Sequence, residues 1–160
     1  MEHNGLLEFI DRAAHLSWKE LDLSRQHLAE LPPDIGQLSQ LQTLNLEMNR
    51  LTSLPWDIGR LSQLRSLNLR SNELTSLPWE IGRLSQLQKL DLGHNKLANL
   101  PREIGQISQL QDLNVSGNGL ITIPSTVGNL KHLERLDLSG NQLTSLPPEI
   151  GELIQLRELN

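Results

Sequence analysis

Residues 64–86 read LRSLNLRSNELTSLPWEIGRLSQ, and this stretch decides the fold because it returns every 23 residues. Close copies occupy residues 41–63, 87–109, 110–132 and 133–155, a looser copy occupies 18–40, and residues 156–160 begin another. A fixed period of 20–50 residues is typical of proteins built from stacked repeats. We therefore expect residues 18–160 to form one repeat domain, preceded by a separate segment at residues 1–17.

The first half of each copy has the pattern of a half-buried strand. Apolar and polar residues alternate between Ser66 and Arg70, which places Leu67 and Leu69 on the same side. One such strand cannot bury its leucines alone, so we expect the copies to stack as a parallel sheet over a continuous leucine core. Asn72, at the bend, is expected to hydrogen-bond the loop backbone through its side-chain amide.

The second half of each copy supplies the crossover that parallel strands require. Pro78 fixes φ and suits the first residue of a short helical turn. Ile81 and Leu84 are expected to point into the core. Gly82 predicts either a left-handed backbone or a close approach between coils.

These residues give the pattern LxxLxLxxNxLxxLPxxIGxLxx, which resembles the 23-residue class of leucine-rich repeats. The pattern is most similar to the Ras-group-related intracellular type of plants and bacteria, including the repeat region of Roco GTPases. The resemblance covers residues 18–160 and recurs six times. It implies an α/β solenoid: a right-handed coil with a parallel β-sheet on the concave face, short helical or 3-10 turns on the convex face, and use as a protein-binding scaffold.

Composition favours a cytoplasmic protein without a nucleic-acid or membrane partner. The formal net charge is −5, and only 2% of the residues are aromatic. The chain has no cysteine, which favours a reducing compartment. Residues 1–17 do not resemble a signal peptide, and no apolar run has the length of a membrane span.

The residues before the first repeat predict an N-terminal capping helix. Leu6, Phe9, Ile10 and Ala13 have helical spacing, and Asn4 is a candidate N-cap. An apolar helical stripe can serve a partner helix or a membrane. Here we interpret it as the cover of the open leucine end of the first repeat. Trp18, in the first leucine slot of that repeat, is expected to seal the junction.

Repeats two to four carry the most distinctive outward-facing residues of the expected concave face, whereas repeats five and six have mostly Ser, Gly and Gln there. The candidate partner-binding residues are Glu47, Met48, Arg50, Arg70, Glu73, Lys89, His94 and Lys96. Many of these charges alternate in sign between coils about 4.8 Å apart, so they can also pair with one another and only hold the sheet in register. The expected pairs are Glu47 with Arg70, the column Arg50–Glu73–Lys96, and the column Lys89–Asp112–Arg135–Glu158. Met48 and His94 have no charge partner in their column and favour a ligand face.

The column that includes Asn68 and Asp91 is interpreted as structural. Its asparagines and aspartates run up the middle of the expected concave face, and neighbouring side chains are expected to form an amide ladder. Its aspartates are too widely spaced by strand count to share one metal ion.

Trp56 and Trp79 are a further departure from the repeat, because they occupy the slot after the proline in two adjacent coils. They can pack on each other and on Pro55 and Pro78. Alternatively, they form a second contact surface, since tryptophan is enriched at interface hot spots.

No motif in the sequence indicates catalysis, a metal site or a cofactor. The five histidines lack HExxH spacing, and neither a GxSxG elbow nor a phosphate loop is present. We therefore expect a binding protein rather than an enzyme.

Three functions remain open at this point. The concave face can recognise a protein partner or another domain of its own chain. The repeats can instead be a regulatory fragment of a larger signalling protein such as a Roco-type GTPase, or a structural spacer without a dedicated ligand. The residues 156–160 stop in mid-strand, which leaves apolar side chains of the last coil partly covered and predicts self-association through this end.

Overall fold

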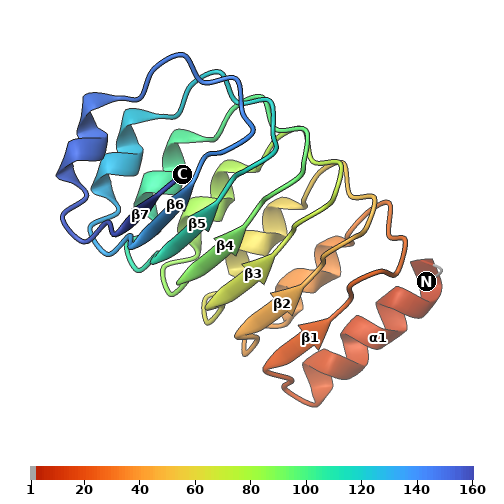
Figure 1. Ribbon diagram of the computed structural model, residues 1–160. Coiled ribbons are helices and arrows are strands. Elements are labelled where there is room, and N and C mark those ends of the chain that lie inside the picture. The colour runs from red at the N-terminus through yellow and green to blue at the C-terminus, as the bar shows by residue number, and fades with distance from the viewer. Residues whose placement is uncertain (1–2) are drawn as a thin grey trace.

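The computed structural model describes residues 3–160, and this part of the chain winds as a solenoid with one strand in each coil (Figure 1). Seven parallel strands in these residues form a single sheet in sequence order. The strands are β1 (Glu20–Asp22), β2 (Thr43–Asn45), β3 (Ser66–Asn68), β4 (Lys89–Asp91), β5 (Asp112–Asn114), β6 (Arg135–Asp137) and β7 (Glu158–Leu159).

The register of the sheet confirms the 23-residue period. Leu44 in β2 lies opposite Leu67 in β3, which lies opposite Leu90 in β4. The strands are shorter than the alternation predicts, because β3 ends at Asn68. Hydrogen bonds between coils nevertheless continue beyond it, since the Leu69 N–H donates to the Asp91 carbonyl at 2.8 Å.

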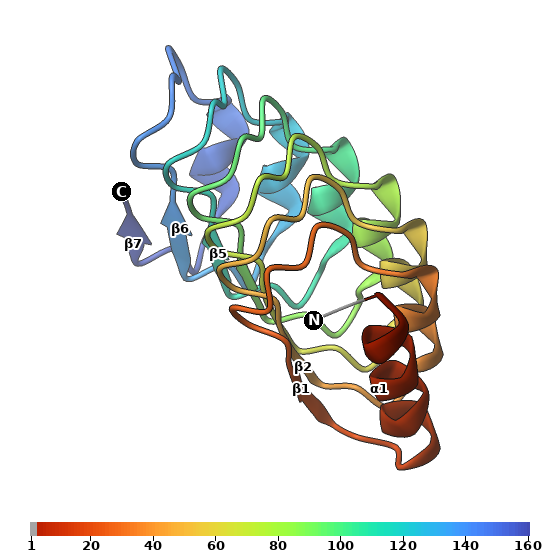
Figure 2. The same ribbon diagram turned by 90° about the vertical axis from the view of Figure 1, so that its right-hand side faces the viewer.

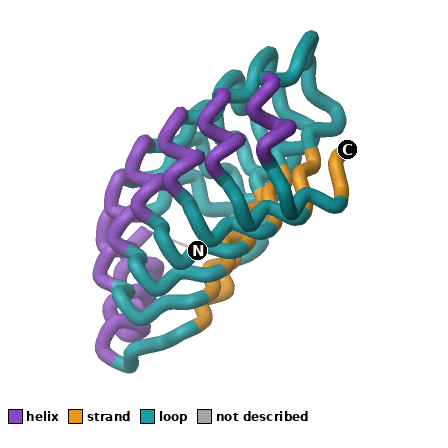
Figure 3. Tube along the Cα trace, turned by 90° about the vertical axis from the view of Figure 1, so that its left-hand side faces the viewer, coloured by secondary structure: helices purple, strands orange, loops and turns teal. Residues whose placement is uncertain are grey.

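Short 3-10 helices form the opposite side of the solenoid (Figure 3). A helical turn is wider than the spacing of about 4.8 Å between strands, so the stack bends with the sheet on its concave face. Each turn begins after a proline with extended φ and ψ, as the repeat predicts. The helices are η1 (Pro33–Gln37), η2 (Trp56–Arg60), η3 (Trp79–Arg83), η4 (Arg102–Gln106), η5 (Ser125–Asn129) and η6 (Pro148–Glu152).

Between these two sides lies an aliphatic core that runs the length of the stack. Leu67 and Leu69 are buried, as are Ile81 and Leu84 from the helical half of the same coil. The alternation of the repeat therefore predicted the inward side chains correctly.

Gly82 marks a close approach between coils. A Cβ atom added at this position would lie 2.6 Å from the carbonyl oxygen of Glu103 in the next coil, which is closer than van der Waals contact allows. Of the two explanations that the sequence left open, the close approach is therefore confirmed. Gly151 occupies the same slot in the last full coil, and a Cβ atom added there would meet nothing within 4 Å.

Helix α1 (His3–His15) covers the first coil beside β1 (Figure 2). Leu6, Ile10 and Ala13 are buried against the core. The rings of Phe9 and Trp18 meet edge to face, with centroids 5.3 Å apart. These contacts confirm the cap and its junction. The prediction that Asn4 is the N-cap is wrong, because the helix already includes His3.

At the other end of the described residues, the last coil leaves apolar side chains in contact with solvent. Ile154 is 81% exposed, and Leu146 and Leu159 are also exposed. Leu153, by contrast, is buried. Self-association through this surface stays a prediction.

The leucine register gives a direct test. We expect Leu67→Ala to lower the free energy of unfolding by about 2–5 kcal/mol, because it leaves a cavity in a close-packed core. Ser66→Ala, on the outward side of the same strand, should change it by less than about 0.5 kcal/mol. Chemical denaturation measures both, and equal losses would contradict the observed register.

The two glycines predict opposite signs for one substitution. Gly82→Ala should destabilise the protein by about 1–3 kcal/mol, because the new methyl group overlaps the Glu103 carbonyl. Gly151→Ala should stabilise it by about 0.4–1 kcal/mol, because it restricts the unfolded chain without a clash. Thermal and urea unfolding compare the two, and a stabilising Gly82→Ala would show that the coils are not in contact here.

Candidate functional site

The candidate site is the solvent-facing side of the sheet. In β1 to β6 the middle leucine points into the core, and the residues before and after it face outward. The first outward column is Glu20, Thr43, Ser66, Lys89, Asp112, Arg135 and Glu158, and the second is Asp22, Asn45, Asn68, Asp91, Asn114 and Asp137.

The second column mainly bonds to its own coil rather than to its neighbours. The Asn68 Oδ1 atom accepts a hydrogen bond of 3.0 Å from the Arg70 N–H, and Asp91 accepts one of 2.8 Å from the Gly93 N–H. At Asp22, the backbone N–H and the hydroxyl of Ser24 hold the pKa below its usual value. The predicted amide ladder is therefore only part of the arrangement. One oxygen of each side chain accepts from the N–H two residues on, and the Asn45 side chain also hydrogen-bonds Asp22 in the neighbouring coil.

The next column has left-handed backbone in every full coil. The values of φ lie between 54° and 66° at Arg25, Met48, Ser71, His94, Gly117 and Gly140. A side chain in this conformation costs roughly 1 kcal/mol relative to glycine. Sequence reasoning missed this constraint, although glycine in the last two full coils was a signal for it. Met48 and His94 are thus kept in this column at a cost to stability.

His94 reaches across to the neighbouring coil. A Cβ atom placed on Gly117 would lie 2.7 Å from the Nδ1 atom of His94, so the His94 imidazole occupies the space that the glycine leaves free. Met48 is 46% exposed. The two side chains therefore present an imidazole and a thioether at the edge of the face, where the strands end.

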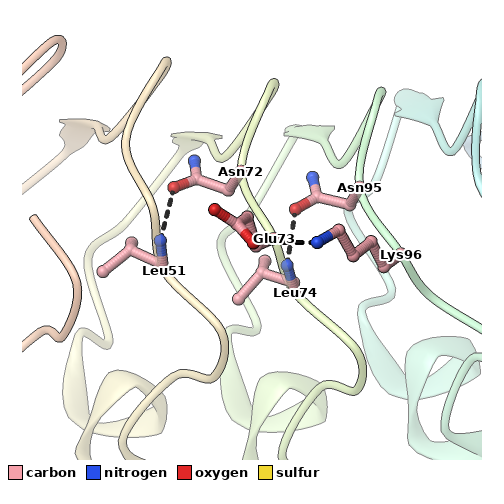
Figure 4. Close-up of polar contacts among 6 residues, drawn as sticks. All are labelled: Leu51, Asn72, Glu73, Leu74, Asn95 and Lys96. Atoms are coloured by element: carbon pink, nitrogen blue, oxygen red, sulfur yellow. Dashed lines mark hydrogen bonds and ion pairs between the residues drawn. The ribbon is translucent and has the colours of Figure 1, made fainter. Parts of the chain in front are cut away.

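A further column, which follows the bend asparagine in each coil and includes Arg50, contains the ion pair that the sequence predicts between Glu73 and Lys96. Their Oε2 and Nζ atoms are 2.8 Å apart, beside the hydrogen bonds that the Leu51 and Leu74 N–H groups donate to the Oδ1 atoms of Asn72 and Asn95 (Figure 4). The hydrogen bond from Lys96, aided by its charge and that of Arg50, lowers the pKa of Glu73. Both side chains are exposed, so the pair adds little to stability.

The predicted pair between Glu47 and Arg70 is not formed among the described residues. Glu47 instead accepts a hydrogen bond of 3.4 Å from the Asn68 amide. The guanidinium of Arg70 leans over the next coil, with its Nη1 atom 3.0 Å from the place where a Gly93 Cβ would sit. Both charges are therefore open to a ligand.

Lys89 likewise does not form the ion pair that the sequence predicts. Its expected partner Asp112 instead binds Arg135, whose Nη2 atom lies 2.9 Å from the carboxylate. This hydrogen bond and charge raise the pKa of Arg135. Within residues 3–160, no carboxylate forms an ion pair with Lys89. Only part of the predicted self-neutralising charge network is thus present.

A hollow of about 330 Å³ lies on the face over β3–β5. Lys89 is the one predicted site residue in its lining, while the others lie nearer the ends of the strands. The polar lining consists of Ser66, Asn68, Lys89, Asp91, Asp112 and Asn114. The sequence identified these slots as outward but not as a hollow, because a hollow depends on the rotamers of the longer side chains that line it, such as Lys89.

Trp56 and Trp79 lie on the other side of the solenoid, at the first positions of η2 and η3. Neither ring stacks on the other. Each instead carries a guanidinium from the end of its own turn, with Arg60 4.5 Å from the centroid of Trp56 and Arg83 4.6 Å from that of Trp79. The expectation that the indoles pack on each other is therefore wrong.

Comparison with known families agrees with this geometry. The family described as leucine-rich repeat region matches residues 56–160, and the family described as leucine rich repeat matches residues 17–74. The chain belongs to the leucine-rich-repeat family. None of the curated proteins compared with this leucine-rich-repeat chain matches it.

Among solved structures, the chain is similar to a leucine-rich-repeat protein of Leptospira interrogans, with 37% identity, a TM-score of 0.70 and 94% of this chain covered. It is also similar to the ectodomain of the receptor kinase GASSHO1/SCHENGEN3 from Arabidopsis thaliana in complex with CASPARIAN STRIP INTEGRITY FACTOR 2, with 32% identity, a TM-score of 0.82 and 92% covered. A third similar structure is the plant peptide hormone receptor RGFR1 in complex with RGF2, with 32% identity, a TM-score of 0.84 and 96% of this chain covered. The leucine-rich-repeat chain spans half the length of the Leptospira protein, and 19% and 25% of the two receptor chains.

Two further findings concern other kinds of site. In the described part of this leucine-rich-repeat chain, no group of three or more His, Cys, Asp or Glu side chains is arranged to hold a metal ion. Residues 3–160 also contain no helix that is long and apolar enough to cross a membrane.

The pair of Glu73 and Lys96 predicts a pH dependence. Because folding lowers the pKa of Glu73, the stabilisation from this pair is complete above the pKa of the unfolded chain and is lost as the pH falls through the folded pKa. We expect Lys96→Gln to raise the pKa of Glu73 towards its usual value in a carboxyl NMR titration. Lys131→Gln, which breaks a distant pair with Glu152, should not. Equal titration of Glu73 in all three proteins would contradict the assignment.

Proposed function

We propose that the concave face over β2–β5 binds an extended segment of a protein. The observation that carries this proposal is the set of charges that the fold leaves without ion pairs around one hollow. Lys89 lines the hollow, and Glu47 and Arg70 flank it. A face built only to hold its own register would pair them, since cross-strand neighbours of opposite charge stabilise a sheet.

The left-handed column supports the same proposal. Glycine suits its backbone best, yet repeats one to four all keep a side chain there, and in repeats two and four these side chains are Met48 and His94 at the edge of the face. Side chains kept at a cost to the backbone cluster at sites of function. Met48 offers an adaptable apolar contact, and His94 offers a hydrogen-bonding group.

The relatives add a precedent for the ligand class. The structures of the two plant receptors, each about a third identical to this chain, are complexes with CASPARIAN STRIP INTEGRITY FACTOR 2 and with RGF2. Proteins of this family are typically binding scaffolds without catalytic activity. We extend this role to the present chain, with a protein segment as its ligand and the cytoplasm as its compartment.

The partial coverage of the relatives favours a second arrangement of the same site. The Leptospira protein and both receptors place a stretch like this one within a longer chain. We propose as the alternative that these coils belong to a Ras-group-related or Roco-type signalling protein, in which another domain of the same chain occupies the face.

The test is site-specific photo-crosslinking with the partner identified by mass spectrometry. A crosslinker at Met48 or His94 should capture a segment, whereas one at Ser139 should not. Adding Arg70→Glu and Glu73→Lys should reduce capture at His94 by more than about tenfold, because the central contacts of an interface carry most of its affinity.

The matched control replaces Ser116, Ser139 and Gln142, which lie at corresponding slots in repeats five and six. This variant should capture as the unaltered protein does. Equal loss from both sets would overturn the placement of the site in repeats two to four. No capture from any position would leave a structural spacer as the better description.

A further inference from the structure

Both exposed aromatic rings of this chain lie in adjacent coils of the convex side. The sequence has one phenylalanine and three tryptophans, and Phe9 and Trp18 pack together at the cap. The other two, Trp56 and Trp79, are 49% and 53% exposed although guanidinium groups cover part of each ring. In a protein with 2% aromatic residues, two half-exposed indoles in adjacent coils are an unusual exposure of apolar surface to solvent.

On this side of the solenoid, the acidic side chains beside the tryptophans are buried and the basic ones lie at the surface. Asp57 and Glu80, the second residues of η2 and η3, are buried. The guanidiniums of Arg60 and Arg83 lie above the rings. Asp57 holds Arg60 at 3.3 Å, whereas Arg83 forms no ion pair within the residues that the structure describes. The outward surface is therefore cationic, although the chain as a whole is acidic.

The next coil continues this cationic surface. Arg102 occupies the slot of the two tryptophans in η4, and its side chain is largely exposed despite a contact of 3.5 Å with Glu103. We call Trp56, Trp79, Arg60, Arg83 and Arg102 the tryptophan–arginine ridge. A guanidinium stacked on an indole keeps the N–H groups of its edge free, and these bind carboxylates in a planar, bidentate way.

A groove continues the ridge. A space of about 400 Å³ lies between η4 and η5, and Arg102 belongs to both features. The remaining lining is polar or small and includes Gly105, Gln106, Ser125, Thr126 and Asn129. The three coil steps from η2 to η5 span at least about 14 Å, which is the length of about four residues of extended chain.

We propose that the tryptophan–arginine ridge and this groove bind an acidic, extended peptide segment of a partner protein. Apolar side chains of the segment lie on the indoles of Trp56 and Trp79, and its carboxylates bind Arg83 and Arg102. The charge complementarity selects acidic segments over basic ones. This surface is separate from the concave face, so both can be occupied at once.

The probe is a synthetic eight-residue peptide that alternates Asp with Leu, compared with one that alternates Lys with Leu. The indole N–H resonances of the three tryptophans report binding to the full chain. We expect the Asp peptide to shift the signals of Trp56 and Trp79 and to leave Trp18 unchanged. The Lys peptide should shift none of them.

Variants assign the effect to the ridge. Trp56→Ser with Trp79→Ser should weaken binding of the Asp peptide by about tenfold, measured by calorimetry, because central aromatic residues dominate such contacts. Arg83→Gln should weaken it severalfold and reduce its dependence on salt. Pro148→Ser, in the same slot of η6, and the triple change Met48→Ala, Arg70→Glu and Glu73→Lys on the concave face should have no effect.

Three outcomes would overturn the proposal. One is equal affinity for the Asp and Lys peptides. Another is unchanged affinity in the double tryptophan variant. The third is a shift of the Trp56 and Trp79 signals by vesicles of phosphatidylserine and phosphatidylcholine but not by the Asp peptide, which would make the ridge a membrane-binding surface.

Discussion

The fold depends on one asparagine in each full coil after the first. Asn72 donates hydrogen bonds to the carbonyls of Leu46 and Leu69 at 2.9 and 3.0 Å, and its oxygen accepts one from the Leu51 N–H. The carbonyls of Leu46 and Leu69 are each shared with the asparagine of a neighbouring coil, Asn49 and Asn95, so successive asparagines satisfy buried backbone groups of two coils at once. The side chain thus turns the chain out of the strand and ties each coil to the one before it. The outward columns, the left-handed residues and the crossover all take their positions from this bend.

The sequence predicted the features that depend on the repeat and missed those that depend on the exact path of the bend. The period sets the register of Leu44 and Leu67, so the sheet and core were predicted correctly. The left-handed φ at Ser71 arises from the turn that leads into Asn72, and a pattern of apolar residues carries no information about it. The pair of Glu47 and Arg70 failed for a similar reason, since the rotamers of long side chains decide which neighbour they reach.

The two surfaces of the solenoid differ in how their charges are arranged. On the concave face, pairs such as Glu73 with Lys96 alternate with charges that form no ion pair, and the candidate site lies among them. On the convex side, the carboxylates of Asp57 and Glu80 are buried, whereas the guanidiniums of Arg60 and Arg83 lie at the surface over the indole rings. The repeat pattern did not predict this division, because the burial of Asp57 depends on how tightly the turns pack. One repeat pattern thus carries two chemically different surfaces without any change in its core.

The contact at Gly82 gives the stack a preferred direction of bending. On the helical side the coils already touch, with the glycine against the Glu103 carbonyl, so straightening the arc would press backbone against backbone. Tightening the arc only parts these turns, and the sheet side keeps its hydrogen bonds. The stack therefore resists straightening more than it resists tightening. It can close around an object that its inner curve holds, but it resists being flattened onto a broad surface.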